Sequence, residues 1–290
     1  EEAFSFFEEH PDANLVSCRM NFFGEKTGGH PLNYKYSRTR LIDLEKQFNY
    51  PQLSFSSCFV RRTALEGMRF NEELSVSEDM LLVNEILYSD GKYGVLNRPI
   101  YWYRKRESHS SAIDRALLND SYYFSTPVLC YKRLLDVFDR NPCLRLYAHY
   151  LVMYDLQWRI LSRNPHYLSA DALMEYKRII INLISRIDDR AIVPQRSLTG
   201  EYKAYVLSLK YGVDFKAVFD SSDDRFSLFC SWLKRFPPSA RIDFITCESD
   251  SICIEGELTA LSRYLDSDLF CRVLYADGNQ YIASVPVLQE

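Results

Sequence analysis

The sequence predicts an α/β layer, followed by a helical region and then an immunoglobulin-like β-sandwich. Strand-like and helix-like segments alternate up to residue 115, which is typical of an α/β layer with a Rossmann-like sheet. Helical patterns dominate from 116 to 218, and short segments of alternating apolar and polar residues follow from 219 to 290. We therefore expect three domains, 1–115, 116–218 and 219–290, with the first and the last incomplete.

Periodicity and turn residues predict the elements of the first domain. Apolar residues on one face predict a helix over 1–10, and a glycine after Asp90 is expected to close a helix over 78–89. A short helix is predicted over 38–48. Strands are predicted over 15–23, 53–61 and 93–104, with interruptions at Ser56-Ser57 and Pro99.

The second domain contains long helical patterns over 121–140, 144–163, 169–187 and 199–211. Ser169 and Thr199 are the expected N-caps, and Asn-Pro pairs at Asn141 and Asn164 separate the helices. In the third domain, Asp277-Gly278 predicts the turn of a β-hairpin. No motif in these two regions points to a reaction.

Composition excludes several classes of function. A net charge of −4 argues against nucleic-acid binding, which depends on a basic surface. No apolar run is long enough to span a membrane, and no signal peptide is visible, so we expect a cytoplasmic protein that can be peripheral at the inner face of the membrane. The first ten residues have a helical pattern without a start signal, which is typical of the middle of a helix. We therefore expect an N-terminal part of a longer protein to precede Glu1.

The eight cysteines are scattered, and no Cys-x-x-Cys occurs. We expect reduced, buried thiols rather than disulfides or a zinc site. The sequence Asp266-Ser-Asp268 is the one Asp-x-Asp, and its place among the predicted strands of the third domain favours a turn. No metal-ligand set is predicted within this chain.

Glu78 and Asp79 open the predicted helix over 78–89. A carboxylate at a helix N-terminus meets the positive end of the helix dipole, so it stays ionised and can serve as a general base. The alternative is a capping box, with Ser75 as N-cap and Glu78 at the third helical position. On spacing alone capping is the commoner explanation, and both roles can coexist if Glu78 caps and Asp79 reacts.

The segment from Tyr101 to Ser111 ends a predicted strand in arginines. The guanidinium groups of Arg104 and Arg106 match phosphate oxygens and can meet a diphosphate leaving group. His109 and Ser110, with the serine that follows, can add hydrogen bonds. The alternative is a strand that runs into a solvated basic loop.

Ser56 and Ser57 interrupt the predicted strand over 53–61 with small polar side chains. These residues can form the floor of an acceptor pocket. The commoner role of such residues is to permit close packing. Cys58 lies between apolar residues without a nearby histidine, so it is not expected to be a nucleophile.

Taken in order, several segments resemble the second half of a family-two GT-A glycosyltransferase. They are Phe55-Ser-Ser-Cys-Phe-Val-Arg-Arg, Met68-Arg-Phe-Asn-Glu-Glu-Leu, Ser77-Glu-Asp-Met, Gly94-Val-Leu and Tyr101-Trp-Tyr-Arg-Lys-Arg-x-x-His-Ser-Ser. The resemblance covers residues 1–115. It implies a partial GT-A fold, Asp79 as the base, Glu78 as its neighbour in the acceptor site, and Arg104 and Arg106 near the diphosphate.

The resemblance also implies a divalent metal, Mn or Mg, held by an Asp-x-Asp in the nucleotide-binding half that would precede Glu1. The domain order resembles bacterial teichoic acid and capsule glycosyltransferases, whose C-terminal β domains serve oligomerisation or polymer binding. We therefore expect an inverting glycosyltransferase with a UDP-type nucleotide-sugar donor, a cell-surface polymer or glycan as acceptor, and a homo-oligomer formed through the C-terminal β domain. Two alternatives stay open: an accessory part of a bifunctional glycerophosphotransferase, and a non-catalytic carbohydrate-binding scaffold.

Overall fold

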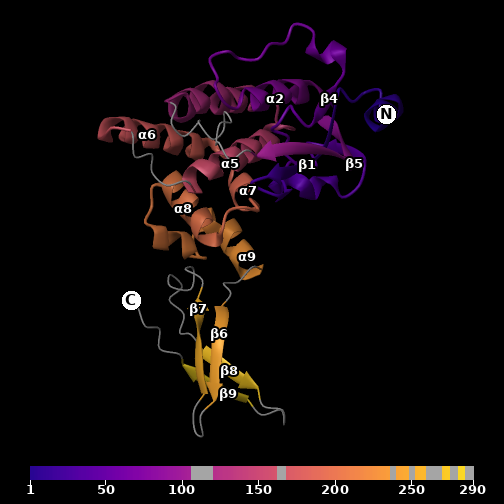
Figure 1. The fold of residues 1–290 in the computed structure, drawn as a ribbon. Helices are drawn as coiled ribbons and strands as arrows, with labels where there is room; N and C mark the ends of the chain where they lie inside the picture. Colours follow the sequence, from indigo (N-terminus) through magenta and orange to yellow (C-terminus); the bar gives the residue numbers. More distant parts are fainter. Residues whose placement is uncertain are drawn as a thin grey trace. The chain divides into compact units, whose positions relative to one another are not determined.

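The computed structural model describes residues 1–105, 120–161 and 168–235, and the backbone of the strands over 240–247, 252–258, 270–274 and 280–284. The chain forms two compact units, Glu1–Val213 and Asp214–Glu290 (Figure 1). The first unit combines a mixed sheet with many helices, so the α/β prediction is confirmed. None of the described helices is both long and apolar enough to cross a lipid bilayer.

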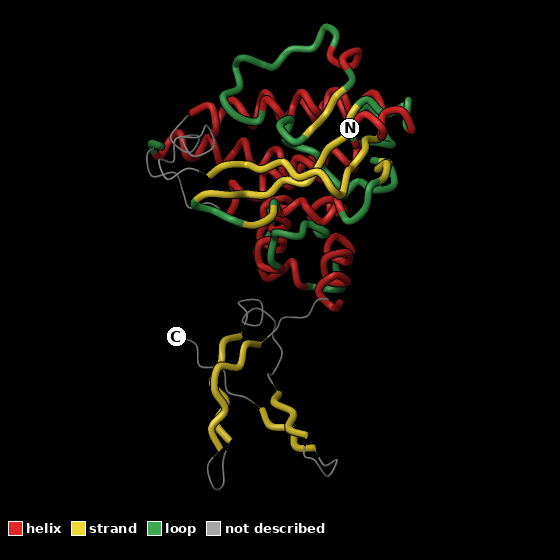
Figure 2. Tube along the Cα trace, turned by 45° about the vertical axis from the view of Figure 1, so that its right-hand side comes forward, coloured by secondary structure: helices red, strands yellow, loops and turns green. Residues whose placement is uncertain are grey.

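The sheet of the first unit has the order β2-β1-β5-β3, and β4 pairs with β1 (Figure 2). The strands β1 and β5 are parallel, and the remaining pairs are antiparallel. Their bounds are β1 Leu15–Gly24, β2 Gly28–Gly29, β3 Arg40–Asp43, β4 Cys58–Val60 and β5 Lys92–Lys105. The strands predicted over 15–23 and 93–104 are thus confirmed.

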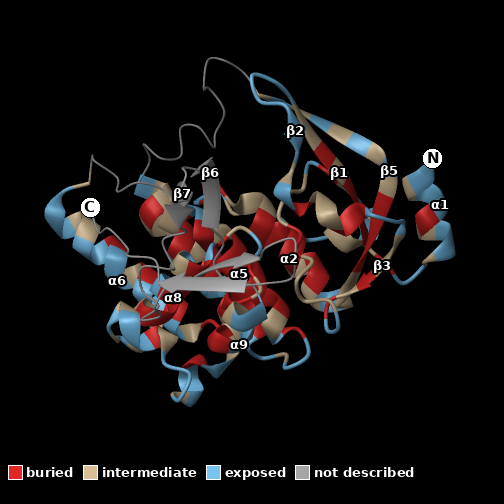
Figure 3. Ribbon diagram, turned by 90° about the horizontal axis from the view of Figure 1, so that it is seen from below, coloured by how far each residue is buried: buried red, intermediate tan, exposed pale blue. Residues whose placement is uncertain are grey.

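The pairing of β1 with β5 changes register in the middle of both strands. Leu96 is the partner of Cys18, whereas Ile100 is the partner of Arg19, so Asn97 to Pro99 form an irregularity. Proline has no N–H to donate to the ladder and is tolerated at such a bulge. Figure 3 shows that the first half of β5 is buried, whereas its second half alternates between half-buried and exposed residues.

The helices α1 (Glu2–Glu9) and α2 (Glu78–Asp90) pack against the sheet. Phe6 of α1 lies so close to Gly94 that a Cβ there would come within 2.3 Å of its ring. Phe6 also joins Val16 and Leu96 in a buried cluster. The helix α2 ends at Gly91, whose φ of 64° is left-handed and whose N–H is bonded to Leu87, as predicted.

The following helices belong to the same unit and confirm the helical character of the region after residue 120. They are η3 (Ser121–Lys132, a π-helix), α4 (Arg133–Phe138), α5 (Arg145–Leu161), α6 (Ala170–Arg186), α7 (Asp189–Ile192) and α8 (Gly200–Tyr211). Ser169 caps α6 through its side chain, which accepts a hydrogen bond from the Ala172 N–H. Thr199 precedes α8 without such a bond.

Two local predictions for the first domain are wrong. The segment over 38–48 is not a helix, because Arg40–Asp43 pairs with β5 as an edge strand. The segment over 53–61 is a strand only from Cys58 to Val60. Its first part turns instead, with the Cys58 N–H bonded to the Phe55 carbonyl. The short 3-10 helices η1 (Pro31–Tyr36) and η2 (Arg62–Leu65) flank these segments.

The second unit begins with η4 (Phe215–Phe219), η5 (Asp224–Phe226) and α9 (Ser227–Arg235). Two antiparallel pairs follow: β6 (Ala240–Cys247) with β7 (Ile252–Leu258), and β8 (Phe270–Leu274) with β9 (Gln280–Ser284). The strands agree with the predicted β-rich character. Their assembly into a sandwich stays a prediction. The described residues do not include the two predicted turns of this region, Asp277-Gly278 and Asp266-Ser-Asp268.

Candidate active site

Asp79 lies in the first turn of α2, and the fold brings it to the turn formed by Ser54 to Ser57. One carboxylate oxygen of Asp79, Oδ2, accepts a hydrogen bond of 3.1 Å from the backbone N–H of Phe55. This contact joins two segments that are 24 residues apart in the sequence. The predicted base and the predicted acceptor floor are therefore neighbours in space.

The helix start differs from the capping box that the sequence predicts. The N-cap is Ser77, not Ser75, and its side chain makes no capping hydrogen bond. Ser77 has a φ of 68°, a left-handed conformation that L-residues adopt at a cost of about 1–2 kcal/mol. Glu78 is consequently the first helical residue and not the third.

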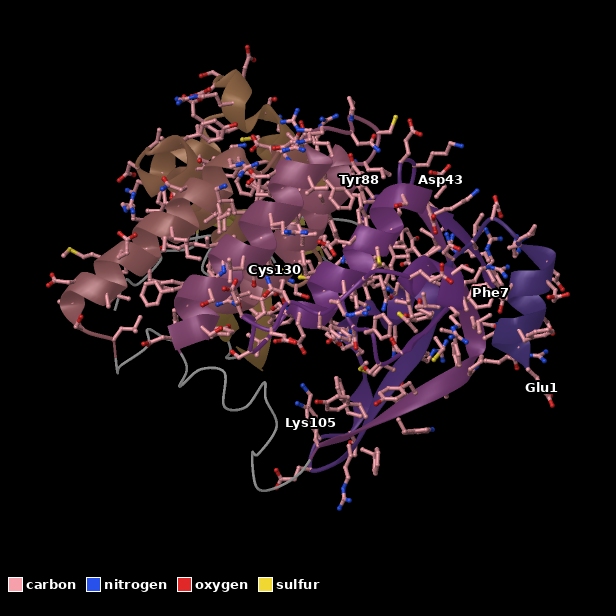
Figure 4. The ribbon with its side chains drawn as sticks, turned by 90° about the horizontal axis from the view of Figure 1, so that it is seen from above. Glu1, Phe7, Asp43, Tyr88, Lys105 and Cys130 are labelled. Carbon is pink, nitrogen blue, oxygen red and sulfur yellow. The ribbon has the colours of Figure 1, made fainter. Side chains whose placement is uncertain are left out.

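The π-helix η3 holds this strained turn in place. Thr126 donates its hydroxyl to the Val76 carbonyl at 3.4 Å, and the Cys130 thiol approaches the Ser77 carbonyl at 3.6 Å. Figure 4 labels Cys130, which is fully buried in the first unit. Backbone strain that neighbouring elements maintain in this way is typical of functional sites.

Glu78 and Asp79 are unequal in their surroundings. Partial burial raises the pKa of Glu78, and the charge of the adjacent Asp79 raises it further. Two neighbouring carboxylates whose environments differ are a common arrangement for acid–base chemistry. In this pair, Asp79 is the carboxylate that has a backbone donor from another segment.

The two serines of the predicted acceptor floor have different positions. Ser56 is exposed, and its hydroxyl lies 2.6 Å from that of Ser54. Ser57 is 4% exposed, and its carbonyl accepts a hydrogen bond from the Cys18 N–H. Ser56 can meet a ligand beside Asp79, whereas the surroundings of Ser57 fit the packing alternative.

A buried polar cluster lies beneath the turn, and the sequence reasoning did not identify it. Its members are Lys35, Gln52, Asn84 and Tyr147, which come from four separate segments of the chain. Asn84 gave a signal in the sequence, because Asn84 and Glu85 interrupt the apolar run from Leu81 to Leu87. The pairing of these groups depends on tertiary structure, so no local pattern could have shown it.

Arg104 lies near the end of β5, on the exposed half of the strand. It shares a strand face with Trp102, which is 58% exposed and makes an edge-to-face contact with Phe23 of β1. No described hydrogen bond or ion pair links Arg104 to Asp79, and the two lie on different elements. Arg106, His109 and Ser110 lie outside the described residues, so their predicted roles stay predictions.

A cavity of about 440 Å³ lies at the opposite end of α2 from Asp79. Its lining includes Asp43, Tyr88, Gly91 and Cys143 (Figure 4 labels the first two). Asp90 lies eleven positions after Asp79 in the helix, which corresponds to about 16 Å along the axis. This cavity is therefore not part of the site around Asp79.

The divalent metal implied by the resemblance finds no ligand set in the described parts of the chain. No group of three or more His, Cys, Asp or Glu side chains comes together there in a way that could hold an ion. Asp188 and Asp189 are engaged with Arg190 and Lys210, respectively. The described residues therefore do not fit a metal centre.

Comparison with solved structures finds S. aureus TarS 1-349. The complex with UDP-GlcNAc has a TM-score of 0.48 and 13% identity, over 88% of this chain and 68% of that one. The complex with UDP has a TM-score of 0.46 and 12% identity, over 89% and 69%. No protein-family model matches the chain.

Comparison with curated proteins finds two relatives in Bacillus subtilis (strain 168). The minor teichoic acid biosynthesis protein GgaB is 30% identical over 272 residues, which are 90% of this chain and 30% of GgaB. The minor teichoic acid biosynthesis protein GgaA is 28% identical over 215 residues, which are 72% of this chain and 48% of GgaA. This chain is thus similar to two minor teichoic acid biosynthesis proteins and spans less than half the length of either.

Proposed function

We propose that this chain acts in an inverting glycosyl transfer, from a UDP-type sugar donor to a hydroxyl of a cell-surface polymer such as a teichoic acid or capsule. The observation that carries the proposal is the position of Asp79. It lies in the first turn of α2, and its carboxylate accepts a hydrogen bond from the amide of Phe55, the residue before the exposed Ser56. The similarity to two teichoic acid biosynthesis proteins supports the polymer as the acceptor.

In the proposed reaction, Asp79 accepts the proton of the acceptor hydroxyl. The hydroxyl oxygen forms a bond to the anomeric carbon while the bond from that carbon to the diphosphate breaks, so the configuration inverts. The nucleoside diphosphate leaves with the electron pair of the broken bond. A carboxylate has several lone-pair sites, so the bond from Phe55 orients Asp79 and leaves capacity for the acceptor proton.

The remaining parts of the proposal rest on the resemblance. The phosphates of the leaving group would be bound by Arg104 and Arg106, because guanidinium forks match phosphate oxygens. Further hydrogen bonds to the same group would come from His109 and Ser110. Ser56 would contact the acceptor. A divalent metal would stabilise the same phosphates, and no step above depends on it. Action at the cytoplasmic face of the membrane and self-association through residues 219–290 are proposed on the same basis.

The proposal is tested by Asp79→Asn in the full-length protein, a change that keeps the shape of the side chain but removes its basicity. We expect transfer from UDP-sugars to a teichoic acid acceptor to fall by about 10²–10⁴-fold, because the proton acceptor is lost. Donor binding, measured by calorimetry, and the unfolding temperature are expected to change little.

The matched control is Asp171→Asn, which makes the same change at the second residue of α6. This variant is expected to retain full activity. Near-normal turnover of Asp79→Asn would remove Asp79 from the role of base. Absence of transfer by the unmodified full-length protein, with a full panel of UDP-sugars, would contradict the proposed function itself.

A carbohydrate-binding scaffold is the second candidate, and the exposed rings of Trp102 and Phe23 favour it. Exposed aromatic side chains on a sheet offer flat apolar surfaces, and contiguous surfaces of this kind often mark binding sites. Polymer affinity that is lost in Trp102→Ala, without any sugar transfer by the unmodified protein, would favour this alternative.

A further inference from the structure

We infer that Lys35 is a positioning residue for Asp79: it holds the segment from Pro51 to Cys58, whose Phe55 amide orients the carboxylate. The inference rests on the proposed function for its catalytic consequence. Its structural part, the dependence of the Phe55–Asp79 contact on Lys35, can be tested without any activity.

Lys35 is 1% exposed, although it carries an ammonium group. Its Nζ donates to the Pro51 carbonyl at 2.6 Å and to Oε1 of Gln52 at 2.5 Å. The same nitrogen lies 5.2 Å from the ring centre of Tyr36 and 5.3 Å from that of Tyr93. None of the ion pairs of the described residues includes Lys35, so neutral oxygens and aromatic faces compensate for its burial.

Gln52 transmits this contact to the turn. Its Nε2 donates to the Ser54 carbonyl at 2.7 Å and to the Cys58 thiol at 3.2 Å. The Cys58 thiol in turn approaches the Ser54 carbonyl at 3.2 Å. The amide group of Gln52 therefore fixes both ends of the turn that contains Phe55.

The same segment is joined to α2 at a second point. Asn84, one helical turn after Met80, donates to the Gln52 carbonyl at 2.9 Å and to the Met80 carbonyl at 2.7 Å. The Tyr147 hydroxyl, from α5, donates to Oδ1 of Asn84 at 2.6 Å. Two contacts thus join the segment to α2, one between Gln52 and Asn84 and one between Phe55 and Asp79. Lys35 stabilises the first contact through its hydrogen bond to the Gln52 side chain.

Lys35 also changes how the free energy of unfolding depends on pH. Burial lowers the pKa of Lys35 to about 7, from an unfolded value of 10.5. Between these values the unfolded chain binds more protons than the folded one, so Lys35 makes the free energy of unfolding rise with pH.

The neighbouring titratable groups act in the opposite direction, but only at higher pH. They are Cys58, whose pKa burial raises from 9.0 to about 12, and the tyrosines Tyr36, Tyr93 and Tyr147, whose pKa values burial raises from 10.0. In the unfolded chain these groups ionise near their ordinary pKa values while they stay neutral in the folded chain, so they make stability fall as the pH rises through 9 and 10. Within this cluster, the contribution of Lys35 is therefore measured between pH 7 and about 8.

The test is Lys35→Met, which retains an apolar side chain of similar length but loses the donors. We expect kcat to fall by about 100-fold, as a displacement of about 1 Å in a reacting group can cause, with the donor KM unchanged. We also expect faster hydrogen exchange of the Phe55 amide by NMR, and a smaller rise in stability with pH between pH 7 and about 8 than in the unmodified protein.

The matched control is Lys203→Met in α8. Lys203 is 3% exposed, and burial lowers its pKa to about 8, so this variant also removes a buried lysine. We expect it to flatten the pH dependence of stability while kcat and the exchange of the Phe55 amide stay unchanged. Equal losses of kcat in the two variants would assign the effect to general destabilisation and overturn the inference.

A second variant, Gln52→Glu, keeps the side-chain shape and gives Lys35 a carboxylate partner, but it removes the donor to Ser54 and Cys58. We expect a folded protein with the same loss of kcat and the same faster exchange at Phe55. Wild-type exchange at Phe55 in both Lys35→Met and Gln52→Glu would overturn the inference, as would failure of both to fold. If the unmodified protein transfers no sugar, the proposed function fails while the exchange measurement still decides the role of Lys35.

Discussion

At the scale of single residues, the fold makes two adjacent carboxylates different. Asp79 receives a backbone N–H from Phe55, whereas burial and the charge of Asp79 raise the pKa of Glu78. The negative charge of Glu78 is therefore a cost that the folded state carries at neutral pH. Such a cost is common at active sites, where local stability is often lower than the sequence permits.

We predict that Glu78→Gln raises the unfolding temperature at pH 7. The pKa of Glu78 is higher in the folded than in the unfolded chain, so its ionisation opposes folding above the folded pKa. This opposition fades as the pH falls through that value towards 4.5, and the two proteins are expected to converge there. Calorimetry at both pH values measures the effect.

Glu2→Gln is the control, because Glu2 is likewise the first residue of a helix but is exposed. A rise of the same size in this control would show that the effect belongs to helix ends in general and not to the pair with Asp79.

At the scale of elements, the start of α2 depends on a helix that follows it by more than 40 residues. Thr126 and Cys130 of η3 contact the Val76 and Ser77 carbonyls, and Ser77 is the one non-glycine residue with positive φ in the described parts of the chain. The first turn of α2, with Asp79, is therefore set by packing against η3 rather than by a side-chain cap.

We predict that Ser77→Gly stabilises the protein by up to about 1 kcal/mol. Glycine adopts a φ of 68° without the steric cost that a Cβ imposes, although its greater freedom in the unfolded chain offsets part of the gain. Ser77→Ala retains the Cβ and is expected to give no gain. Urea unfolding distinguishes the two, and equal stabilities of the glycine and alanine variants would show that the backbone at this position is not strained.

At the scale of the whole molecule, the helices after residue 120 complete the core of the first unit. Tyr147 of α5 bonds to Asn84 of α2, and its hydroxyl also accepts the Gln52 N–H at 3.4 Å. Leu144 contacts the position of Gly91 at the end of α2. Figure 3 shows that much of α5 is buried. The site around Asp79 therefore depends on residues on both sides of position 115.

We predict that residues 1–213 form a stable unit and that residues 1–115 do not. The shorter chain loses Tyr147 and exposes the buried face of α2, whereas the longer one keeps the compact unit intact. Circular dichroism with thermal unfolding measures the difference. A cooperative transition in 1–115 at the temperature of 1–213 would show that the sheet is independent of the helices.

Much of the fold could be predicted because the signals are local. The local signals are the apolar segment of β1, the glycine after α2 and the serine cap of α6, and each depends on neighbouring residues in the chain. The wrong predictions concern segments that tertiary contacts override. Arg40–Asp43 forms a strand because it pairs with the edge of β5. Ser77, and not Ser75, is the N-cap of α2, and the Cys130 thiol of η3 contacts its carbonyl.

The sequence by itself predicted β1, β5, α2 and the helices after residue 120, and it identified the acidic pair at the start of α2, because periodicity, glycine and helix-terminal chemistry act over a few residues. Only the tertiary structure decided that Phe55 donates to Asp79, that Ser57 is buried, and that Lys35 supports the turn through Gln52. These contacts join residues that lie far apart in the chain. Their energies depend on burial and on mutual orientation, and neither is encoded in any short stretch of sequence.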